Sequence, residues 1–214
     1  MKRHIVCLGD SNTHGYTPEP IPGFRFSEEE RWTCRLQAAL GADWLVIEEG
    51  LPGRTTVFED PVEEGMSALP YLYPCLMSHA PVELLVLMLG TNDTKERLGA
   101  NACAIGKGLR RLLRKAQTID CWAGGRANIL VIAPLCIGEG VTRSPVAQEM
   151  GAGCVDKSRR LPGQFRAAAR ELGCHFLDAN TLGLSYNTID HMHLTRDGHA
   201  RLAEALAARI PTLF

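Results

Sequence analysis

The sequence predicts an α/β fold in which a five-stranded parallel sheet lies between two layers of helices. Two observations predict it: short, uninterrupted apolar runs recur along the chain, and helix-like stretches separate them. Strands that are covered on both faces are apolar throughout, as the strands of parallel sheets are. Alternation of strand and helix over the whole length then favours one parallel sheet with helices on both faces.

Five apolar runs are the candidate strands: His4–Leu8, Trp44–Ile47, Leu84–Leu89, Ile129–Ala133 and Cys174–Leu177. Glycine or proline stops three of them at once. Right-handed crossovers between such strands favour a doubly wound, flavodoxin-like three-layer α/β/α sandwich.

Four further stretches have helical character: Arg31–Leu40, Ala102–Ala116, Lys157–Leu172 and Thr195–Ile210. The first has the i, i+4, i+7, i+8 apolar stripe of a helix. The second gathers cations near its end, where they suit the helix dipole. In the third, Pro162 predicts a kink or a late start. In the fourth, Thr195 is a plausible N-cap.

Length and composition favour one globular domain over residues 1–214. The formal net charge is −1, so neither nucleic acid nor an anionic membrane is an expected partner. No apolar run approaches the ~20 residues of a membrane span, and the N-terminal run is too short for a secretion signal. Thr17–Glu30 and Gly138–Asp156 are predicted to be long loops, which often carry function.

Eight cysteines are spread along the chain, and no two of them form a C-x-x-C pair. A chain of this length does not need a disulfide frame in order to fold. We therefore expect reduced thiols in a cytoplasmic protein, with the cysteines packed as small apolar side chains.

Polar clusters follow the strands at the place where an open parallel sheet binds its ligands, beyond the carboxyl ends. They are Gly9–Thr13, Glu49–Thr56, Gly90–Asp93 and, after a loop, Asp190–Leu194. We expect them to converge at one edge of the sheet. Asp10, Asn12, His14 and Arg54 are candidate pocket residues there.

Ser11, Asp190 and His193 are the candidate catalytic residues. A serine hydroxyl needs a base to take its proton, histidine titrates in the right range, and an acid can fix the tautomer of that histidine. The order Ser, Asp, His along the chain is compatible with a triad. His191 is the rival base, although adjacent side chains such as those of Asp190 and His191 usually diverge. The structural alternative for Ser11 is a serine that caps a turn, and the alternative for Asp190 and His193 is a polar loop that caps the last helix.

Gly53 and Asn92 are candidate donors to an oxyanion. A glycine lets a backbone N–H approach a substrate oxygen without a Cβ in the way, and an asparagine amide can supply a further donor. The structural alternative for Gly53 is a turn glycine, and the alternative for Asn92 is an Asx-turn or a helix N-cap.

No metal is expected. Asp190, His191, His193 and His199 lie close together in sequence but lack the helical H-E-x-x-H spacing, and no Cys/His ligand pairs occur. The glycines near residue 50 match neither phosphate-binding nor dinucleotide-binding motifs.

Taken together, Gly9-Asp10-Ser11, Gly53, Gly90-Thr91-Asn92-Asp93 and Asp190-x-x-His193 resemble blocks I, II, III and V of the SGNH hydrolases, also called GDSL esterases. The strings GDSNTHGY, EEGLPGRTT and MLGTND resemble the arylesterase and acyltransferase subgroup known for perhydrolysis. The resemblance covers nearly the whole chain. His14 departs from it, because close relatives commonly carry tryptophan there.

The resemblance implies a serine esterase for short-chain acyl or aryl esters that can also transfer acyl groups to alcohols or peroxide. Ser11 would attack the ester carbonyl, His193 would act as general base and then acid, and Asp190 would orient His193. The N–H groups of Ser11 and Gly53 and the Asn92 side chain would hold the oxyanion, with no metal or organic cofactor. The expected partners are a small-molecule ester and further copies of the chain, with Gly138–Asp156 as lid or subunit contact.

Two other functions stay open. A carbohydrate esterase that removes acetyl groups from sugars would need aromatic and polar side chains near Ser11. A non-catalytic binding module would be expected to have lost at least one of the four main site residues. Arg54 could meet an acidic group of the substrate, but an ion pair with Glu59 or Asp60 is favoured.

Overall fold

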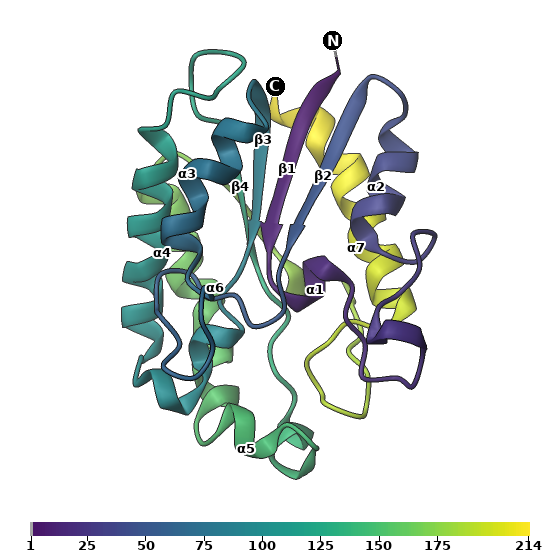
Figure 1. Cartoon of the computed structure of the whole chain (residues 1–214), viewed down its shortest axis with the longest axis vertical. Helices are drawn as coiled ribbons and strands as arrows, with labels where there is room; N and C mark the ends of the chain where they lie inside the picture. The colour runs from purple at the N-terminus through teal and green to yellow at the C-terminus, as the bar shows by residue number, and fades with distance from the viewer. Residues whose placement is uncertain (1) are drawn as a thin grey trace.

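The computed structural model describes residues 2–214 and is built around one five-stranded sheet (Figure 1). All neighbouring strands are parallel, in the order β2-β1-β3-β4-β5. The strands are β1 (Arg3–Gly9), β2 (Trp44–Gly50), β3 (Val82–Met88), β4 (Ile129–Ala133) and β5 (His175–Asp178). The predicted fold class is confirmed, and each predicted run corresponds to one strand.

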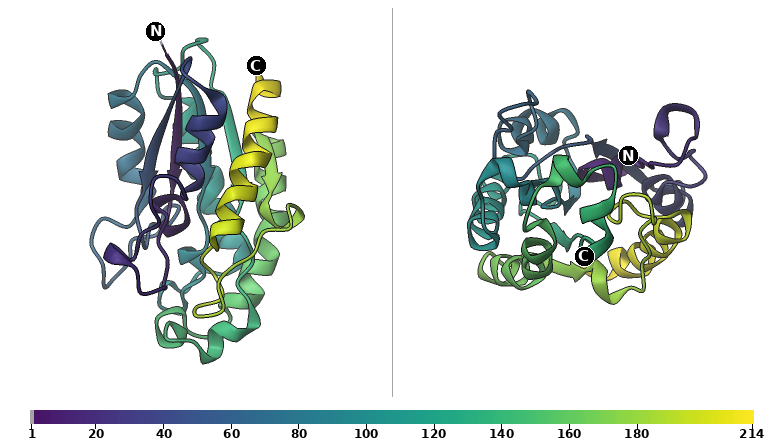
Figure 2. Two further views of the ribbon diagram at one scale, coloured as in Figure 1. Left: turned by 90° about the vertical axis from the view of Figure 1, so that its right-hand side faces the viewer. Right: turned by 90° about the horizontal axis from the view of Figure 1, so that it is seen from below.

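Helices cover both faces of the sheet, so the molecule has three layers (Figure 2). The helices are α1 (Ser11–His14), α2 (Trp32–Leu40), α3 (Ala68–Ser78), α4 (Ala102–Gln117), α5 (Ala147–Met150), α6 (Cys154–Glu171) and α7 (Arg196–Arg209). α2 and α7 pack on one face, and α3, α4 and α6 pack on the other. Both ends of the chain therefore contribute to one structure, which is compatible with the one-domain prediction.

β1 shows how the apolar run serves both layers. Val6 and Leu8 belong to the core beneath α3, α4 and α6, while Ile5 and Cys7 belong to the core beneath α2 and α7. All four side chains are fully buried, which explains why the strand has no polar alternation. The chain winds outward in opposite directions from β1 and β3, so a crevice forms where these two strands end.

α3 was not among the predicted helices. Pro70 and Pro74 interrupt the sequence pattern and suggest that no helix forms. The helix nevertheless buries one face with helical spacing, formed by Ala68, Leu72, Cys75 and Leu76. Pro70 falls in the first turn, where the missing N–H has no partner within the helix in any case. The Ser67 side chain caps the helix by accepting from the Leu69 N–H at 3.4 Å.

α6 begins three residues before the predicted helix and continues through Pro162, so a late start is wrong. Pro162 has no N–H to donate to the carbonyl of Ser158. The Cys136 thiol donates to that carbonyl at 3.7 Å instead. A neighbouring side chain thus compensates for the interruption in the helix.

Gly138–Asp156 is not the plain loop that was predicted. It contains a 3₁₀ turn at Glu139–Arg143, helix α5 and the first turn of α6. Its apolar side chains form a small core of their own, which includes Met150 and also Met192 from the loop before α7. The segment is therefore attached to the site described below.

All eight cysteines are free thiols, as expected. No helix within residues 2–214 is long and apolar enough to cross a membrane.

Candidate active site

Ser11, His193 and Asp190 lie in one chain of hydrogen bonds. The Ser11 Oγ lies 2.8 Å from His193 Nε2, and His193 Nδ1 lies 2.6 Å from Asp190 Oδ2. Ser11 is 7% exposed and His193 is 8% exposed, so both can be reached from solvent, whereas Asp190 is buried. The predicted catalytic residues are thus brought together, in the arrangement of a nucleophile, a base and an orienting acid.

The end of β1 places Ser11. Asp10 caps the short helix α1, because its carboxylate accepts the Asn12 N–H at 3.0 Å. A Cβ on Gly9 would lie 2.0 Å from Thr13 Oγ1 and 2.9 Å from the Met88 carbonyl, so only glycine allows the helix to start this close to the sheet. Ser11 is therefore held at the crevice between β1 and β3.

The loop before α7 is shaped by carboxylate and amide side chains. Asp190 Oδ1 accepts the N–H groups of Met192 and His193, each at 3.1 Å. Asn187 accepts the N–H of Asp190 at 3.0 Å and donates to the His193 carbonyl at 3.0 Å. Every one of these bonds orders the turn from which the His193 ring projects.

The charge of Asp190 follows from this environment. Burial alone would raise its pKa, but the hydrogen bond to His193, the charge of that ring and the two N–H donors together lower it below its ordinary value. An ionised Asp190 accepts a hydrogen bond from His193 Nδ1–H, which keeps the proton on that nitrogen. The His193 Nε2 is then the acceptor that faces the Ser11 hydroxyl.

Asn12 joins the two halves of the site. Its Oδ1 accepts the Leu194 N–H at 2.9 Å, and its Nδ2 donates to the Met192 carbonyl at 3.4 Å. Asn12 is buried and lies outside the cavity wall, although the sequence predicted a pocket residue. Its contacts are those of a positioning residue that fixes the histidine loop against the serine helix.

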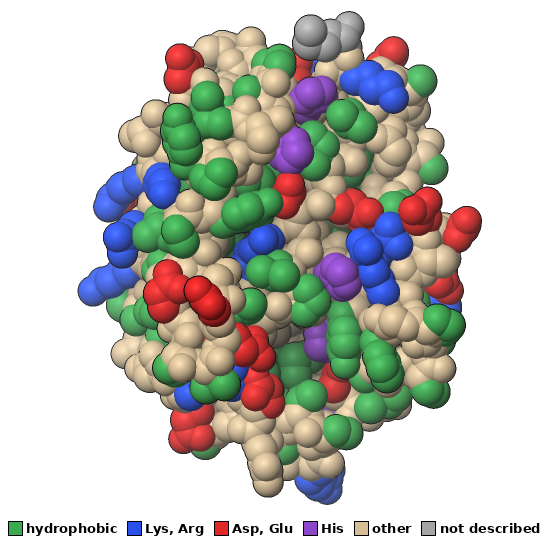
Figure 3. All heavy atoms as spheres, in the orientation of Figure 1, with side chains coloured by type: hydrophobic (Ala, Val, Ile, Leu, Met, Phe, Trp, Pro, Cys, Tyr) green, Lys and Arg blue, Asp and Glu red, His purple; other side chains and the backbone are tan. Residues whose placement is uncertain are grey.

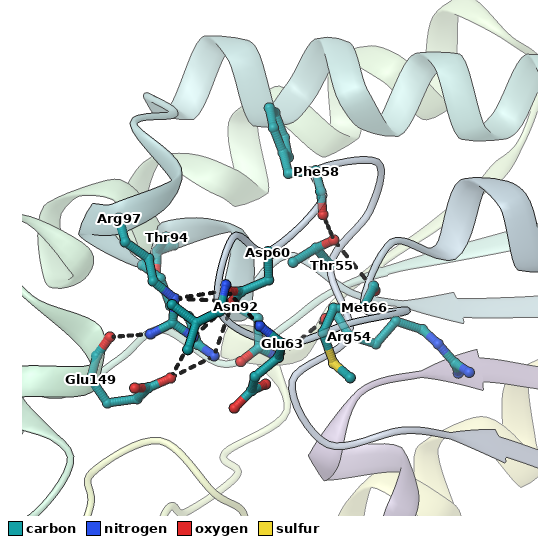
Figure 4. Close-up of polar contacts among 12 residues, drawn as sticks. Arg54, Thr55, Phe58, Asp60, Glu63, Met66, Asn92, Thr94, Arg97 and Glu149 are labelled. Atoms are coloured by element: carbon teal, nitrogen blue, oxygen red, sulfur yellow. Dashed lines mark hydrogen bonds and ion pairs between the residues drawn. The ribbon is translucent and has the colours of Figure 1, made fainter.

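The other three candidate pocket residues also lie outside the cavity wall. Asp10 is buried beneath it, and burial raises the pKa of Asp10 to about 6. His14 is half-buried, and its carbonyl accepts from Arg25 at 2.7 Å. The Arg54 side chain points away from the other residues of the close-up, toward the strands (Figure 4). There its guanidinium donates to the carbonyls of Gly9 and Glu49.

The predicted ion pair of Arg54 with Glu59 or Asp60 is therefore wrong. Asp60 instead forms ion pairs with two cations from later in the chain, Arg97 at 2.7 Å and Lys95 at 3.8 Å. Arg97 and Lys95 also bind Glu149, at 2.7 Å and 2.8 Å. Figure 4 shows this network, which joins the loop after β2 and the loop after β3 to α5.

Gly53 and Asn92 lie in the same wall as Ser11 and His193. The Asn92 Nδ2 donates to the Arg54 carbonyl at 3.1 Å, which fixes the orientation of its amide. Gly53 has φ = +88°, and a Cβ there would lie 2.8 Å from Met66 Sδ. The backbone angle favours glycine, whereas the close contact is with a flexible methionine side chain that can move aside.

The cavity in front of these residues has a volume of about 300 Å³. Figure 3 shows a hollow in the lower half of the molecule, with acidic side chains along one rim. Its apolar part is formed by Val146, Met150 and Met192, and its polar rim carries charged side chains from three segments. The Tyr16 ring packs against the His193 ring with a centroid distance of 4.6 Å.

Sequence reasoning missed these wall residues. Tyr16 is the last residue of GDSNTHGY and Met192 lies between Asp190 and His193, so both could have been found from the predicted motifs. Val146 and Met150 reach the site only because α5 folds back over the end of the sheet.

The rival residues have other contacts. The His191 ring lies against Gly140, where an added Cβ would be 2.2 Å from its Nε2, whereas His193 faces Ser11. His199 is fully buried and accepts the Trp32 N–H at 3.2 Å. The histidines near residue 190 therefore do not share one ligand site.

Comparison with known proteins agrees with this geometry. Residues 7–201 match the model of the GDSL-like lipase/acylhydrolase family. The chain belongs to this family. A search of curated protein sequences gave no match.

Among solved structures similar to this family member, the native M. smegmatis aryl esterase is 33% identical, with a TM-score of 0.90 over 99% of this chain and 100% of its own. Est24, a carbohydrate acetylesterase from Sinorhizobium meliloti, is 35% identical, with a TM-score of 0.90 over 100% of both chains. A carbohydrate acetylesterase family member from the same organism is 32% identical, with a TM-score of 0.88 over 99% of this chain and 98% of its own. Family and neighbours together support a carboxylic ester hydrolase, as predicted.

Proposed function

We propose that this GDSL-family chain is a serine esterase for short-chain acyl or aryl esters that acts through an acyl-enzyme on Ser11. The observation that carries the proposal is the pair of short contacts from Ser11 to His193 and from His193 to Asp190, at the wall of a solvent-accessible cavity. A serine activated in this way needs no cofactor to attack an ester.

In the first half of the reaction, the Ser11 Oγ forms a bond to the carbonyl carbon while its proton passes to His193 Nε2. The carbonyl oxygen becomes an oxyanion, for which the Ser11 and Gly53 N–H groups and the Asn92 amide are the proposed donors. The C–O bond to the alcohol then breaks, and the alcohol leaves with the proton from His193 Nε2. The acyl group stays on Ser11.

In the second half, His193 Nε2 takes a proton from water as the water oxygen attacks the acyl carbon. The same donors hold the second oxyanion. Collapse breaks the bond to Ser11 Oγ, which recovers its proton from His193, and a carboxylic acid leaves. Asp190 keeps its charge throughout and stabilises the imidazolium form of His193.

The size of the cavity supports short acyl chains. Its volume of about 300 Å³ is at the lower end of the range of small-molecule sites. Val146, Met150 and Met192 give the apolar wall on which an acyl or aryl group can pack.

An acetylated sugar is the second candidate substrate. The rim carries Glu63, Lys95 and Glu149, which could bind hydroxyl groups. The similarity to Est24, described as a carbohydrate acetylesterase, supports this alternative. Comparison of kcat/KM for an acetylated sugar and for p-nitrophenyl acetate decides between the two substrate classes.

Three finer predictions belong to the same proposal. An alcohol or peroxide that replaces water in the second half-reaction would make the enzyme an acyltransferase or perhydrolase, and the products can be separated by chromatography. A homo-oligomer is tested by light scattering, and a cytoplasmic location by cell fractionation.

The main test combines three p-nitrophenyl esters with a serine-directed phosphonate. We expect acetate and butyrate to be hydrolysed much faster than octanoate, and intact-mass measurement to find one phosphonyl group, absent from Ser11→Ala. Loss of the nucleophile is expected to lower kcat by about 10⁶. Ser78→Ala is the control, because Ser78 is exposed on α3 and bonds only to backbone carbonyls of its own helix. Full activity in Ser11→Ala would overturn the proposal.

A further inference from the structure

A second cluster of reactive side chains lies outside the active-site cavity, where β2 ends beside α3. Glu49 comes from β2, Cys75 lies in the last turns of α3, and His79 caps the C-terminus of that helix four residues later. One ligand atom from each residue lies within 4.8 Å of the others. The closest pair is His79 Nε2 and Glu49 Oε1, at 2.7 Å.

These three residues supply the donor atoms that zinc prefers: a thiolate, an imidazole nitrogen and a carboxylate oxygen. In a tetrahedral zinc site such donors lie roughly 3.5 Å apart, given metal–ligand distances of about 2.0–2.3 Å. The three ligand atoms lie within 4.8 Å of one another, and the 2.7 Å contact between His79 and Glu49 would open to admit the ion. We propose that Glu49, Cys75 and His79 form a Zn²⁺ site, with water as the fourth ligand.

A hydrogen bond outside the cluster supports the carboxylate ligand. The Tyr71 hydroxyl donates to Glu49 Oε2 at 2.7 Å. With Oε2 held by Tyr71, Oε1 contacts His79. Outer hydrogen bonds of this kind hold the ligating carboxylates of known metal sites in place.

The helix also favours a cation at this position. Cys75 and His79 are spaced i, i+4, which places their side chains on the same face of α3. His79 is the C-terminal cap of α3, and the partial negative charge at a helix C-terminus attracts cations.

The site has an entry path. The side chains of His79 and Glu49 are 27% and 17% exposed, while Cys75 is 1% exposed. A metal ion could reach the nitrogen and oxygen ligands from solvent and meet the sulfur on the inner side. Arg54 lies over the Tyr71 ring at 4.8 Å and donates to backbone carbonyls, so it does not occupy the Glu49 carboxylate, whose oxygens contact Tyr71 and His79 instead.

The proposed ion has a structural role. It would tie the end of β2 to the C-terminus of α3, outside the cavity that Ser11 lines, and would take no part in the acyl-transfer steps. Zn²⁺ is therefore expected to raise the melting temperature of the folded chain, because a ligand that binds only the native state stabilises it. This expectation does not depend on the proposed esterase mechanism.

The experiment uses Co²⁺ as a spectroscopic probe on the full-length, reduced and metal-free protein. We expect one Co²⁺ per chain, the visible bands of a tetrahedral ion and a near-ultraviolet thiolate-to-cobalt band, all removed by one equivalent of Zn²⁺. Cys75→Ser should abolish the thiolate band. His79→Gln and Glu49→Gln should each weaken Zn²⁺ binding, measured by calorimetry, by at least about 10-fold.

Cys103→Ser is the matched control, because Cys103 is an exposed thiol outside the cluster. It should bind Co²⁺ as the unchanged protein does. The proposal is overturned if the unchanged protein shows no thiolate band, or if the band survives in Cys75→Ser. Since the buried Cys75 position could affect folding, unchanged Zn²⁺ affinity in both His79→Gln and Glu49→Gln would overturn it independently.

Discussion

Asp190 contacts His193 through both of its carboxylate oxygens. Oδ2 lies 2.6 Å from the ring Nδ1, and Oδ1 accepts the backbone N–H of His193 at 3.1 Å. One side chain therefore sets both the place of the residue and the rotation of its ring. The three-residue spacing in Asp-x-x-His makes this double contact possible within a single turn.

Asp190→Asn separates these two contacts. The amide oxygen can still accept backbone N–H groups, but the ring is no longer held with its proton on Nδ1, so Nε2 cannot accept the Ser11 proton. We expect kcat for p-nitrophenyl acetate to fall by about 10⁴, with little change in melting temperature. A loss of less than tenfold would mean that Asp190 is not the orienting acid.

Asn92→Ala removes one proposed oxyanion donor. We expect kcat to fall by about 10²–10³ while KM changes little, because this donor acts on the transition state. Asn101→Ala is the control: Asn101 caps α4 through the Ala104 N–H at 2.9 Å and lies outside the cavity. The control should lose about 1 kcal/mol of stability and keep its kcat. Equal kcat losses in both variants would assign Asn92 a structural role.

The sheet could be predicted from the sequence because each buried strand is an unbroken apolar run. Helix α3 could not, since Pro70 and Pro74 are read as breaks even though its buried stripe has helical spacing. The capping serine, Ser67, was the local signal that could have revealed it.

The candidate catalytic pair Asp190 and His193 could be predicted because its three-residue spacing reflects local geometry. The contacts of Arg54 could not. Its nearest acids in sequence suggested an ion pair, but Asp60 is bound by Arg97, which the fold brings in from the loop after β3. The pocket wall depends on such contacts between distant segments, and no local pattern encodes them.

Glu149→Gln tests the network that holds α5 over the cavity. Hydrogen bonds from Arg97 and Lys95 lower the pKa of Glu149 from 4.5 to about 2. The ionised side chain therefore contributes stability that is present above about pH 4.5 and lost as the pH falls toward 2.

The variant should be less stable by about 0.5–1 kcal/mol at pH 7, since the pair is partly exposed, and the difference should shrink at pH 3. Urea denaturation at the two pH values measures it. Glu139→Gln, which breaks a more exposed pair with Arg159, is expected to change little. A difference for Glu149→Gln that is the same at both pH values would exclude the charge as its cause.

His199 is a buried group whose titration should limit stability in acid. Its Nδ1 accepts the Trp32 N–H at 3.2 Å, and its Nε2 has no hydrogen-bond partner within residues 2–214. Burial, followed by nearby positive charge from His193, lowers the pKa of His199 from 6.5 to about 3. Below pH 6.5 the unfolded chain takes up a proton that the folded chain does not. The free energy of unfolding therefore decreases as the pH is lowered.

His199→Asn keeps an acceptor near the Trp32 N–H and removes this titration. Over the interval from pH 7 to pH 5, the unchanged protein should lose about 2 kcal/mol from His199 that the variant does not lose. Asp10 and Asp93, whose pKa values burial raises to about 6, act in the opposite sense but are present in both proteins. The comparison of the two pH slopes therefore isolates His199. Parallel slopes would show that this histidine titrates equally in the folded and unfolded chain.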